Sequence, residues 1–401
     1  MVTIISIIFV LQLFLQNYLV LASPILGQSR ETLEIIIGGD CPPPSPPPEP
    51  PCPPPPLLLF ESKRVEIAYY VIQKFKGKIK HDPFGIYKHM GFNCAIVPDY
   101  KVQALAAVDF NQFMFDGPDL TLDGFLDELP NIKIFHANTN KFKGTTPKRS
   151  NNNYNGEFPY NDLGPKNLYF LDLRFNTFSR LVPPQVFLLN LDVLFINNNN
   201  LMQKLPDNLG STPVLYLTLA NNKFTGPIPR SIGQACKTLH EVLFLNNQLT
   251  GCLPYEIGLL NKATVFYVSK NQLTGKIPHS FGCLAKMQIL NLAQNQFYGP
   301  VPEVLCKLPN LKNLALTYNY FTELLQKKVL DVRMNCIPGL PMQRSAGECA
   351  AFFCKPRCCP DEKKSLGLVP NSIGSFEQNQ FDSSATSAPA PTYSALKPHS
   401  L

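Results

Sequence analysis

The sequence has few of the residues on which catalysis and nucleic-acid binding depend. Among its 401 residues are only six histidines and no tryptophan, and no histidine lies in a recognisable triad, metal or phosphate motif. The 36 Lys and Arg residues exceed the 29 Asp and Glu residues by a formal +7, but they form no basic block. We therefore predict that the protein is not an enzyme, needs no cofactor and binds no nucleic acid.

Charged side chains are absent from the first 22 residues, which Ile, Leu, Val and Phe dominate. Val20-Leu21-Ala22 offers a small-residue cleavage site before Ser23, so residues 1–22 are predicted to be a secretory signal peptide. The alternative is an uncleaved membrane anchor, because the run approaches the ~20 apolar residues that span a bilayer. After cleavage no membrane association is expected.

The twelve cysteines of a secreted chain predict structural disulfides in an oxidising compartment. A metal site is not expected, although Cys354, Cys358 and Cys359 lie close together. No histidine stands among them, and the second pair of a C-x-x-C…C-x-x-C site is missing.

Two flanks are too poor in apolar residues to fold alone. Residues 41–56 read CPPPSPPPEPPCPPPP, which predicts an extended polyproline II rod. The far end, SSATSAPAPTYSALKP, alternates proline with alanine. Ser45-Pro46-Pro47-Pro48 resembles the Ser-proline units of extensins, and the Ala-Pro alternation resembles modules that receive arabinogalactan, so the resemblance implies wall-anchoring segments. The alternative is that both flanks are linkers.

A repeat dominates the middle of the chain. VLYLTLANNKFTGPIP is followed by LHEVLFLNNQLTGCLP, ATVFYVSKNQLTGKIP and MQILNLAQNQFYGPVP, all of which fit L-x-x-L-x-L-x-x-N-x-L-x-G-x-[IVL]-P. From Asn152 onward the repeat asparagines are spaced by 23 to 25 residues. Each unit supplies one short strand that cannot be buried alone, so the pattern predicts an α/β solenoid with a parallel concave β-sheet.

The repeat asparagines are predicted to point inward and to bond the backbone of the adjoining coil, because a buried amide must be satisfied. This structural ladder is expected at Asn140, Asn176, Asn199, Asn222, Asn247, Asn271, Asn295 and Asn319, with Asn152 as a further repeat member.

Residues that alternate with the inward leucines should face the concave side, because side chains switch faces at every strand position. The candidate partner-binding residues are His136, Asp172, Arg174, Phe175, Phe195, Thr218, Leu243, Leu245, Tyr267, Lys270, Asn291 and Tyr318. The apolar ones form a candidate patch, unless neighbouring coils shield them.

The G-x-[IVL]-P endings resemble the plant-specific subclass of leucine-rich repeats. KIFHANTNKFKGTTP, NLYFLDLRFNTFS, DVLFINNNN and NCIPGLPMQRSAGECAAFF resemble the leucine-rich-repeat extensins, in particular small forms with a Pro-rich stretch before the repeats. The resemblance implies a secreted, extracellular cell-wall protein that binds small cysteine-rich signalling peptides, the rapid alkalinization factors, or another wall protein.

Other partners and functions stay open. The mild basic excess hints at a polyanion, which in a wall would be pectin. The similar repeats of polygalacturonase inhibitors suggest a defence role, and the Pro-rich flanks suggest a purely structural wall glycoprotein.

Three departures from the family pattern stand out. The segment KHMGFNC is shorter than the family's cap sequence, which leaves Cys94 without its expected partner. Asn140 and Asn152 are half a repeat apart, and a half-coil cannot stack in register. No cysteine lies between Phe321 and Cys336. A faulty gene model or a degenerating copy would explain these gaps.

Solenoid ends need capping, and the cysteines after the last repeat are predicted to supply the C-terminal cap. Cys283 and Cys306 lie at nearly equivalent places on adjacent coils and are predicted to pair. The disulfide candidates are thus Cys283, Cys306, Cys336, Cys349, Cys354, Cys358 and Cys359. The predicted divisions are a signal peptide at 1–22, a Pro-rich segment at 23–59, an N-terminal cap at 60–105, repeats at 106–330, a Cys-rich cap at 331–360 and a tail at 361–401.

Overall fold

The computed structural model describes residues 59–80, 91–97, 101–117, 120–142, 168–324, 331–356 and 359. All of them belong to one unit, Leu57–Asn371. The predicted signal peptide, nearly all of the Pro-rich segment and the predicted tail lie outside the described residues, as do Asn152 and Cys358. Among the described residues, no helix has the length and apolar character needed to cross a bilayer.

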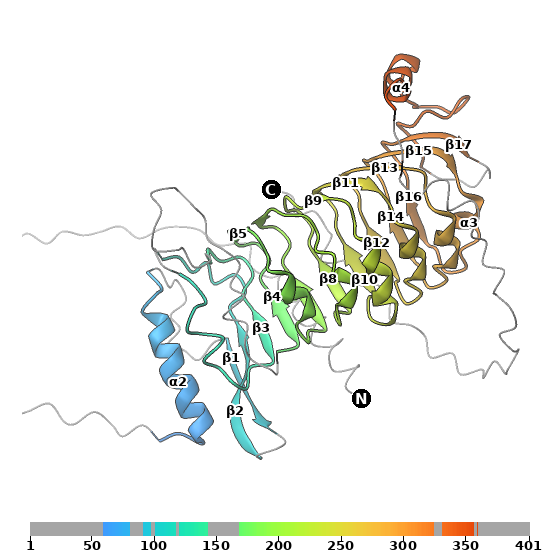
Figure 1. Ribbon diagram of the computed structural model, residues 1–401. Coiled ribbons are helices and arrows are strands. Elements are labelled where there is room, and N and C mark those ends of the chain that lie inside the picture. The colour runs from blue at the N-terminus through green and yellow to red at the C-terminus, as the bar shows by residue number, and fades with distance from the viewer. Residues whose placement is uncertain are drawn as a thin grey trace, which may run out of the picture. The chain divides into compact units, whose positions relative to one another are not determined.

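A ten-stranded sheet runs through this unit, with one short strand from each successive coil (Figure 1). Its order is β1 (Phe92–Val97), β2 (Val102–Asp109), β3 (Ile134–His136), β4 (Phe170–Asp172), β6 (Val193–Phe195), β8 (Tyr216–Thr218), β10 (Glu241–Leu243), β12 (Val265–Tyr267), β14 (Ile289–Asn291) and β16 (Asn313–Ala315). The pair β1–β2 is antiparallel, and from β2 onward the pairs are parallel. The predicted α/β solenoid is confirmed.

A second set of strands follows the ladder asparagines and was not predicted. It comprises a five-stranded sheet of β9 (Thr225–Gly226), β11 (Gln248–Cys252), β13 (Gln272–Gly275), β15 (Gln296–Val301) and β17 (Tyr320–Leu324), and a pair of β5 (Ser179–Arg180) and β7 (Asn200–Leu201). The motif glycines lie within these strands at positive φ, for example +77° at Gly251. Glycine adopts this conformation without a Cβ clash, which allows each coil to bend.

Each coil then returns through a short helix. These helices are η3 (Pro184–Leu188), η4 (Leu209–Ser211), η5 (Arg230–Lys237), η6 (Tyr255–Leu259), η7 (His279–Cys283) and α3 (Glu303–Cys306). In the four regular repeats the residue before the helix is the motif proline: Pro229, Pro254, Pro278 and Pro302. Proline fixes φ and lacks the N–H that a helix start leaves unpaired, so the motif sets where each helix begins.

Two helices flank the repeats (Figure 1). Helix α2 (Lys63–Lys76) is capped by Ser62, whose side chain accepts a hydrogen bond from the Val65 N–H at 3.2 Å. It buries Phe75 against Phe125, with ring centroids 4.1 Å apart. Helix α4 (Ala346–Phe353) begins with a capping box formed by Ser345 and Glu348.

The asparagine ladder holds adjacent coils together. The Asn222 Nδ2 donates to the Ile196 and Leu219 carbonyls at 3.0 and 3.1 Å, and the Leu201 N–H donates to its Oδ1 at 3.1 Å. The same pattern recurs at Asn140, Asn176, Asn199, Asn247, Asn271, Asn295 and Asn319, and also at Asn335, which was not predicted.

The expected half-coil between Asn140 and Asn152 is wrong. The Asn176 Nδ2 donates to the Ala137 carbonyl at 2.8 Å, and the Phe142 N–H donates to its Oδ1 at 3.2 Å. Strands β3 and β4 also pair in register. Asn140 and Asn176 are therefore consecutive rungs of the ladder, although 36 positions separate them in the sequence.

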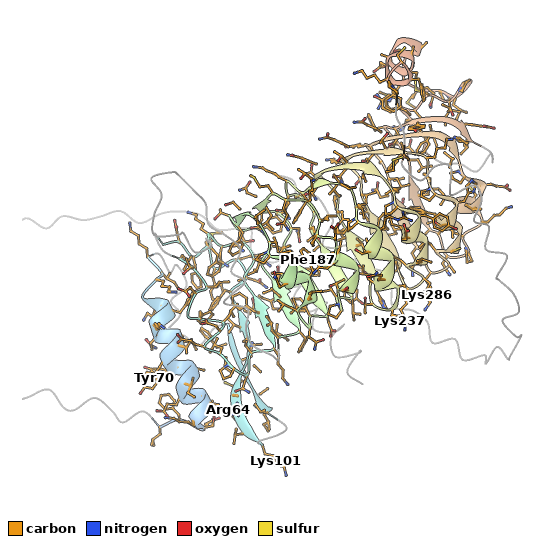
Figure 2. The ribbon with its side chains drawn as sticks, in the orientation of Figure 1. Arg64, Tyr70, Lys101, Phe187, Lys237 and Lys286 are labelled. Atoms are coloured by element: carbon orange, nitrogen blue, oxygen red, sulfur yellow. A yellow bond between two sulfur atoms is a disulfide. The ribbon has the colours of Figure 1, made fainter. Side chains whose placement is uncertain are left out.

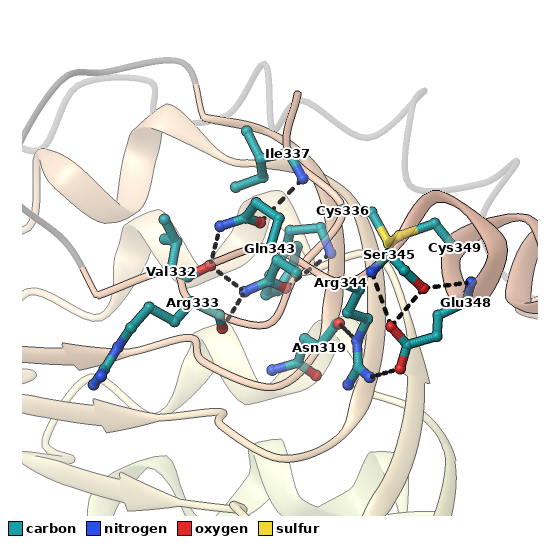
Figure 3. The surroundings of a disulfide bond; sticks show 12 residues. Asn319, Val332, Arg333, Cys336, Ile337, Gln343, Arg344, Ser345, Glu348 and Cys349 are labelled. Atoms are coloured by element: carbon teal, nitrogen blue, oxygen red, sulfur yellow. Dashed lines mark hydrogen bonds and ion pairs between the residues drawn. A yellow bond between two sulfur atoms is a disulfide. The ribbon is translucent and has the colours of Figure 1, made fainter. Parts of the chain in front are cut away.

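Two disulfides join described residues. Cys336 pairs with Cys349 inside the C-terminal cap, where the Gln343 amide also bonds the Val332 carbonyl and the Ile337 N–H (Figure 3). Cys252 on β11 pairs with Cys359 across 107 positions, which ties the cap to the repeats.

The predicted Cys283–Cys306 pair is wrong, since Cys283 is an exposed thiol without a disulfide. Cys283 follows its ladder asparagine by one position more than Cys306 follows its own. One residue in a short helix corresponds to a rotation of about a third of a turn. The two side chains therefore leave their coils in different directions. Cys354 is also an exposed thiol, because the cap is closed by Cys349 and Cys359 instead.

Replacing a ladder residue should destabilise the fold strongly. We expect Asn222→Ala to lower the free energy of unfolding by about 2–4 kcal/mol, because several buried backbone groups lose their partner at once. Urea unfolding of the full chain measures this change. Asn261→Ala, at an exposed loop position, is the control and should have little effect. A similar loss in both variants would contradict the role assigned to the ladder.

The disulfide map can be tested by alkylating the native protein and mapping its peptides without reduction. We expect linked peptides for Cys252–Cys359 and Cys336–Cys349, and alkylated Cys283 and Cys354, because these two thiols are exposed. Recovery of a peptide that links Cys283 to Cys306 would refute this arrangement.

Candidate partner-binding surface

The predicted partner-binding residues differ widely in exposure. Phe175, Lys270 and Tyr318 are exposed, whereas Arg174, Phe195, Leu245, Tyr267 and Asn291 are half-buried. His136, Asp172, Thr218 and Leu243 are less than a tenth exposed. Strands stacked at about 4.8 Å bring equivalent side chains into contact, and this contact shields those in the middle of the sheet. The expected apolar patch is therefore reduced mainly to Phe175 and the partly exposed Phe195, Leu245 and Tyr267.

A buried ion pair occupies the sheet at β4. Arg174 donates to both carboxylate oxygens of Asp172, at 2.9 and 2.8 Å, and its guanidinium lies 5.0 Å from the Phe195 ring centroid. His136 Nδ1 is 3.5 Å from the same carboxylate. Burial alone would raise the pKa of Asp172, but Arg174 and His136 hold it well below its usual range. The carboxylate is a fixed charge with its own partners, which suits a structural role better than a ligand site.

A second carboxyl, Glu241 on β10, lies between Tyr216 of β8 and Val265 of β12 in register. Burial raises the pKa of Glu241 to about 7. Burial also raises the pKa of Tyr216, and the nearby carboxylates Glu241 and Asp192 raise it further.

The neighbouring imidazole responds in the opposite sense. Burial, with Lys262 and Lys286 nearby, lowers the pKa of His240. The middle of the ten-stranded sheet therefore favours neutral side chains near pH 7, since burial disfavours every charged form.

The residue before each ladder asparagine has a left-handed backbone. These residues form what we call the left-handed ridge: Thr139, Phe175, Asn198, Asn221, Asn246, Lys270, Gln294, Tyr318 and Met334, with φ between +52° and +58°. The ridge N–H groups donate across to the next coil, as Asn221 does to the Leu245 carbonyl at 2.9 Å. The ridge thus continues the parallel hydrogen-bond ladder at the edge of the sheet.

A hollow of about 670 Å³ lies where the C-terminal cap meets the last coils. It is lined by Asn271, Gln294, Asn295, Gln296, Tyr318, Tyr320, Arg344, Phe352 and Lys355. The Tyr320 and Phe352 rings stack with centroids 3.5 Å apart, and the Arg344 guanidinium lies 4.2 Å from the Tyr320 centroid. Arg344 also donates to the Asn319 carbonyl at 2.8 Å, which fixes it in place.

Most of this hollow was missed by the sequence reasoning. Tyr320 follows a ladder asparagine, and Arg344, Phe352 and Lys355 lie beyond the repeats, where no periodicity places them. The cap brings them together by folding back onto β15 and β17. The GECAAFF string indicates a cap but not its docking site. Among the described residues, no group of three His, Cys, Asp or Glu side chains could hold a metal ion.

Comparisons with known proteins agree with this architecture. The Leucine Rich Repeat family model matches residues 262–284. Leucine-rich repeat extensin-like protein 7 of Arabidopsis thaliana is 36% identical over 335 residues, which are 77% of this chain and 77% of that protein. Leucine-rich repeat extensin-like protein 6 of the same plant is 57% identical over 189 residues, 46% of this chain and 39% of that protein. The chain spans about two fifths of the length of several such relatives.

A solved structure with the same fold is the leucine-rich-repeat ectodomain of the Arabidopsis receptor kinase HAESA, in complex with an N-terminally extended IDA peptide hormone ligand. The two chains share 24% identity with a TM-score of 0.57, over 68% of this chain and 46% of that one.

The half-buried carboxyl of Glu241 predicts a pH-dependent stability. Its folded pKa of about 7 lies above the ordinary 4.5, so its neutral form stabilises the fold fully below pH 4.5 and this contribution is lost as the pH rises through 7. Glu241→Gln removes the titration. We expect it to raise the free energy of unfolding above pH 7 by on the order of 2–3 kcal/mol, and to change it little at acidic pH.

Urea unfolding at a series of pH values measures this difference. Glu323→Gln, which changes an exposed carboxyl, should follow the wild-type curve. Parallel curves for Glu241→Gln and the wild type would show that Glu241 is not held neutral.

Proposed function

The chain belongs to the leucine-rich repeat extensin-like family, and from this premise we propose that it is a secreted cell-wall protein that binds a small signalling peptide. The peptide is of the cysteine-rich rapid alkalinization factor type, and the protein links it to the organisation of the wall. The observation that carries the proposal is the aromatic and cationic hollow between the last coils and the cap.

The chemistry of the hollow suits an anchoring side chain of a peptide. Stacked Tyr320 and Phe352 provide an apolar wall, and Tyr and Arg are the residue types that most often carry binding energy at interfaces. Arg344 is fixed by the Asn319 carbonyl, so little side-chain freedom is lost on binding. A preformed wall of this kind favours an aromatic or amide-rich peptide segment.

The remainder of the surface supports the same reading. Half-buried Tyr267 on β12 and Leu245, which follows β10, offer further apolar contact. The fold is also that of a receptor ectodomain solved with a peptide hormone, although that likeness concerns the fold alone.

The wall linkage is proposed from the sequence flanks. The apolar start, residues 1–22, favours secretion, and the contiguous prolines of residues 41–56 resemble wall-anchored extensins. The chain would then hold its ligand at a fixed place in the wall, because the repeat domain and the Pro-rich segment belong to one polypeptide.

Calorimetric titration of the full chain with a panel of rapid alkalinization peptides tests the proposal. We expect at least one peptide to bind, and Tyr320→Leu or Lys355→Ala to weaken it about tenfold or more, because each removes part of the hollow. Lys286→Ala is the matched control, since Figure 2 places Lys286 well away from the cap. If no peptide of the panel binds the wild-type chain, the proposal fails.

A further inference from the structure

The left-handed ridge carries an arrangement that the peptide proposal does not use. Its three central residues are linked side chain to side chain: the Asn221 Nδ2 donates to the Asn198 Oδ1 at 2.8 Å, and the Asn246 Nδ2 donates to the Asn221 Oδ1 at 2.8 Å. A carboxamide has two N–H groups and two acceptor lone pairs, so this chain uses half of the capacity of Asn221. The remaining donor and acceptor of each amide lie on a surface that is partly or fully exposed.

Exposed aromatic rings stand on both sides of this amide chain. Phe175 is 43% exposed and Tyr318 is 48% exposed, and each occupies a ridge position. Lys270 and Gln294 fill the rungs between Asn246 and Tyr318. The ridge is therefore a line of polar groups, one per coil, with an apolar ring near either end.

The aromatic residues are poor choices for this backbone. A left-handed φ is tolerated best by glycine and asparagine, and a bulky residue at such a φ is strained. The central rungs use asparagine, but Phe175 adopts φ +52° and Tyr318 φ +57°. Neither ring belongs to the buried core. Neither the backbone conformation nor burial in the core favours an aromatic ring at these two positions, so both rings are available to contact a ligand.

Spacing and charge indicate the kind of ligand. The ridge rungs repeat at the strand spacing of about 4.8 Å, whereas an extended peptide advances by about 3.3 Å per residue and loses register with successive amides. A pyranose residue in a β-linked chain is about as long as one rung is high. Lys270 is the single charged side chain among the described ridge residues, which does not match the charge of a polyuronate at every unit.

We propose that the left-handed ridge is a binding site for a linear, neutral, β-linked polysaccharide. The amides of Asn198, Asn221 and Asn246 exchange hydrogen bonds with sugar hydroxyls. Phe175 and Tyr318 stack against the apolar faces of pyranose rings at the two ends of the site. This site shares Gln294 and Tyr318 with the lining of the hollow, but its amide chain and Phe175 lie outside the hollow, and it does not depend on a peptide partner.

Affinity electrophoresis of the full chain in native gels that contain hydroxyethyl cellulose tests the proposal. We expect the wild-type chain to be retarded. Phe175→Asn, Tyr318→Asn and Asn221→Gly should each weaken the retardation about tenfold, because each removes a contact without blocking the left-handed backbone. Tyr70→Asn, which removes an exposed ring from α2 (Figure 2), should leave the retardation unchanged.

Thermal unfolding of the same variants separates contact from folding. Phe175→Asn and Tyr318→Asn should keep or raise the wild-type Tm, because asparagine relieves the strain at positive φ. A clear fall in Tm would show that the rings serve the fold and would overturn their assignment.

Three electrophoretic results would overturn the site itself. The first is no retardation of the wild type by hydroxyethyl cellulose. The second is retardation by polygalacturonate alone, which would indicate a polyanion site. The third is that reduced, carboxymethylated casein retards the wild-type chain as strongly as hydroxyethyl cellulose does and that the ridge variants lose this retardation too. That result would indicate that the ridge binds an extended polypeptide.

Discussion

The repeats depend on one kind of hydrogen bond. Where each coil leaves its strand, the side-chain amide of an asparagine bonds backbone groups that would otherwise lack a partner. Asn222 bonds carbonyls on its own coil and on the preceding one, and it accepts a backbone N–H as well. Buried backbone groups without partners would be costly, so every coil must place an asparagine there. That requirement in turn forces the preceding residue into the left-handed region. The ladder inside and the ridge outside are two consequences of one constraint.

The constraint is local, and this explains how Asn140 and Asn176 can be adjacent rungs although they are far apart in the sequence. Asn140 and Asn176 are 36 positions apart, yet the Asn176 side chain bonds the coil of Asn140 as each ladder asparagine bonds the preceding coil elsewhere. Stacking requires only that β3 meets β4 in register and that Asn176 reaches the Ala137 carbonyl. The length of chain between those points matters little, because closing a longer loop adds only slowly to the entropy cost.

The sequence predicted what periodicity controls and missed what depends on tertiary contact. The ladder from Asn176 to Asn319 follows from the spacing of asparagines, because each occupies the same place in a repeated unit. Asn335 was missed because it follows Asn319 by only 16 positions, whereas the regular ladder asparagines are 23 to 25 positions apart, although Leu330 and Val332 keep the apolar spacing of the strand. The pairing of Cys252 with Cys359 could not be read, since nothing local relates positions 107 apart. The hollow was missed for the same reason: Arg344 and Phe352 reach it only through that docking.

The two ends of the repeats differ in whether their polar side chains already have partners within the protein. At β4, Asp172 and Arg174 are buried and bonded to each other, so a ligand there would have to break a desolvated ion pair. Toward the C-terminal end, the exposed Lys270, Gln294 and Tyr318 keep their polar ends in water. A ligand replaces water more easily than it replaces a buried partner. Polar binding energy is therefore available mainly from the central rungs toward the cap, where the ridge and the hollow meet at Tyr318, whereas the end at β4 offers the exposed apolar ring of Phe175.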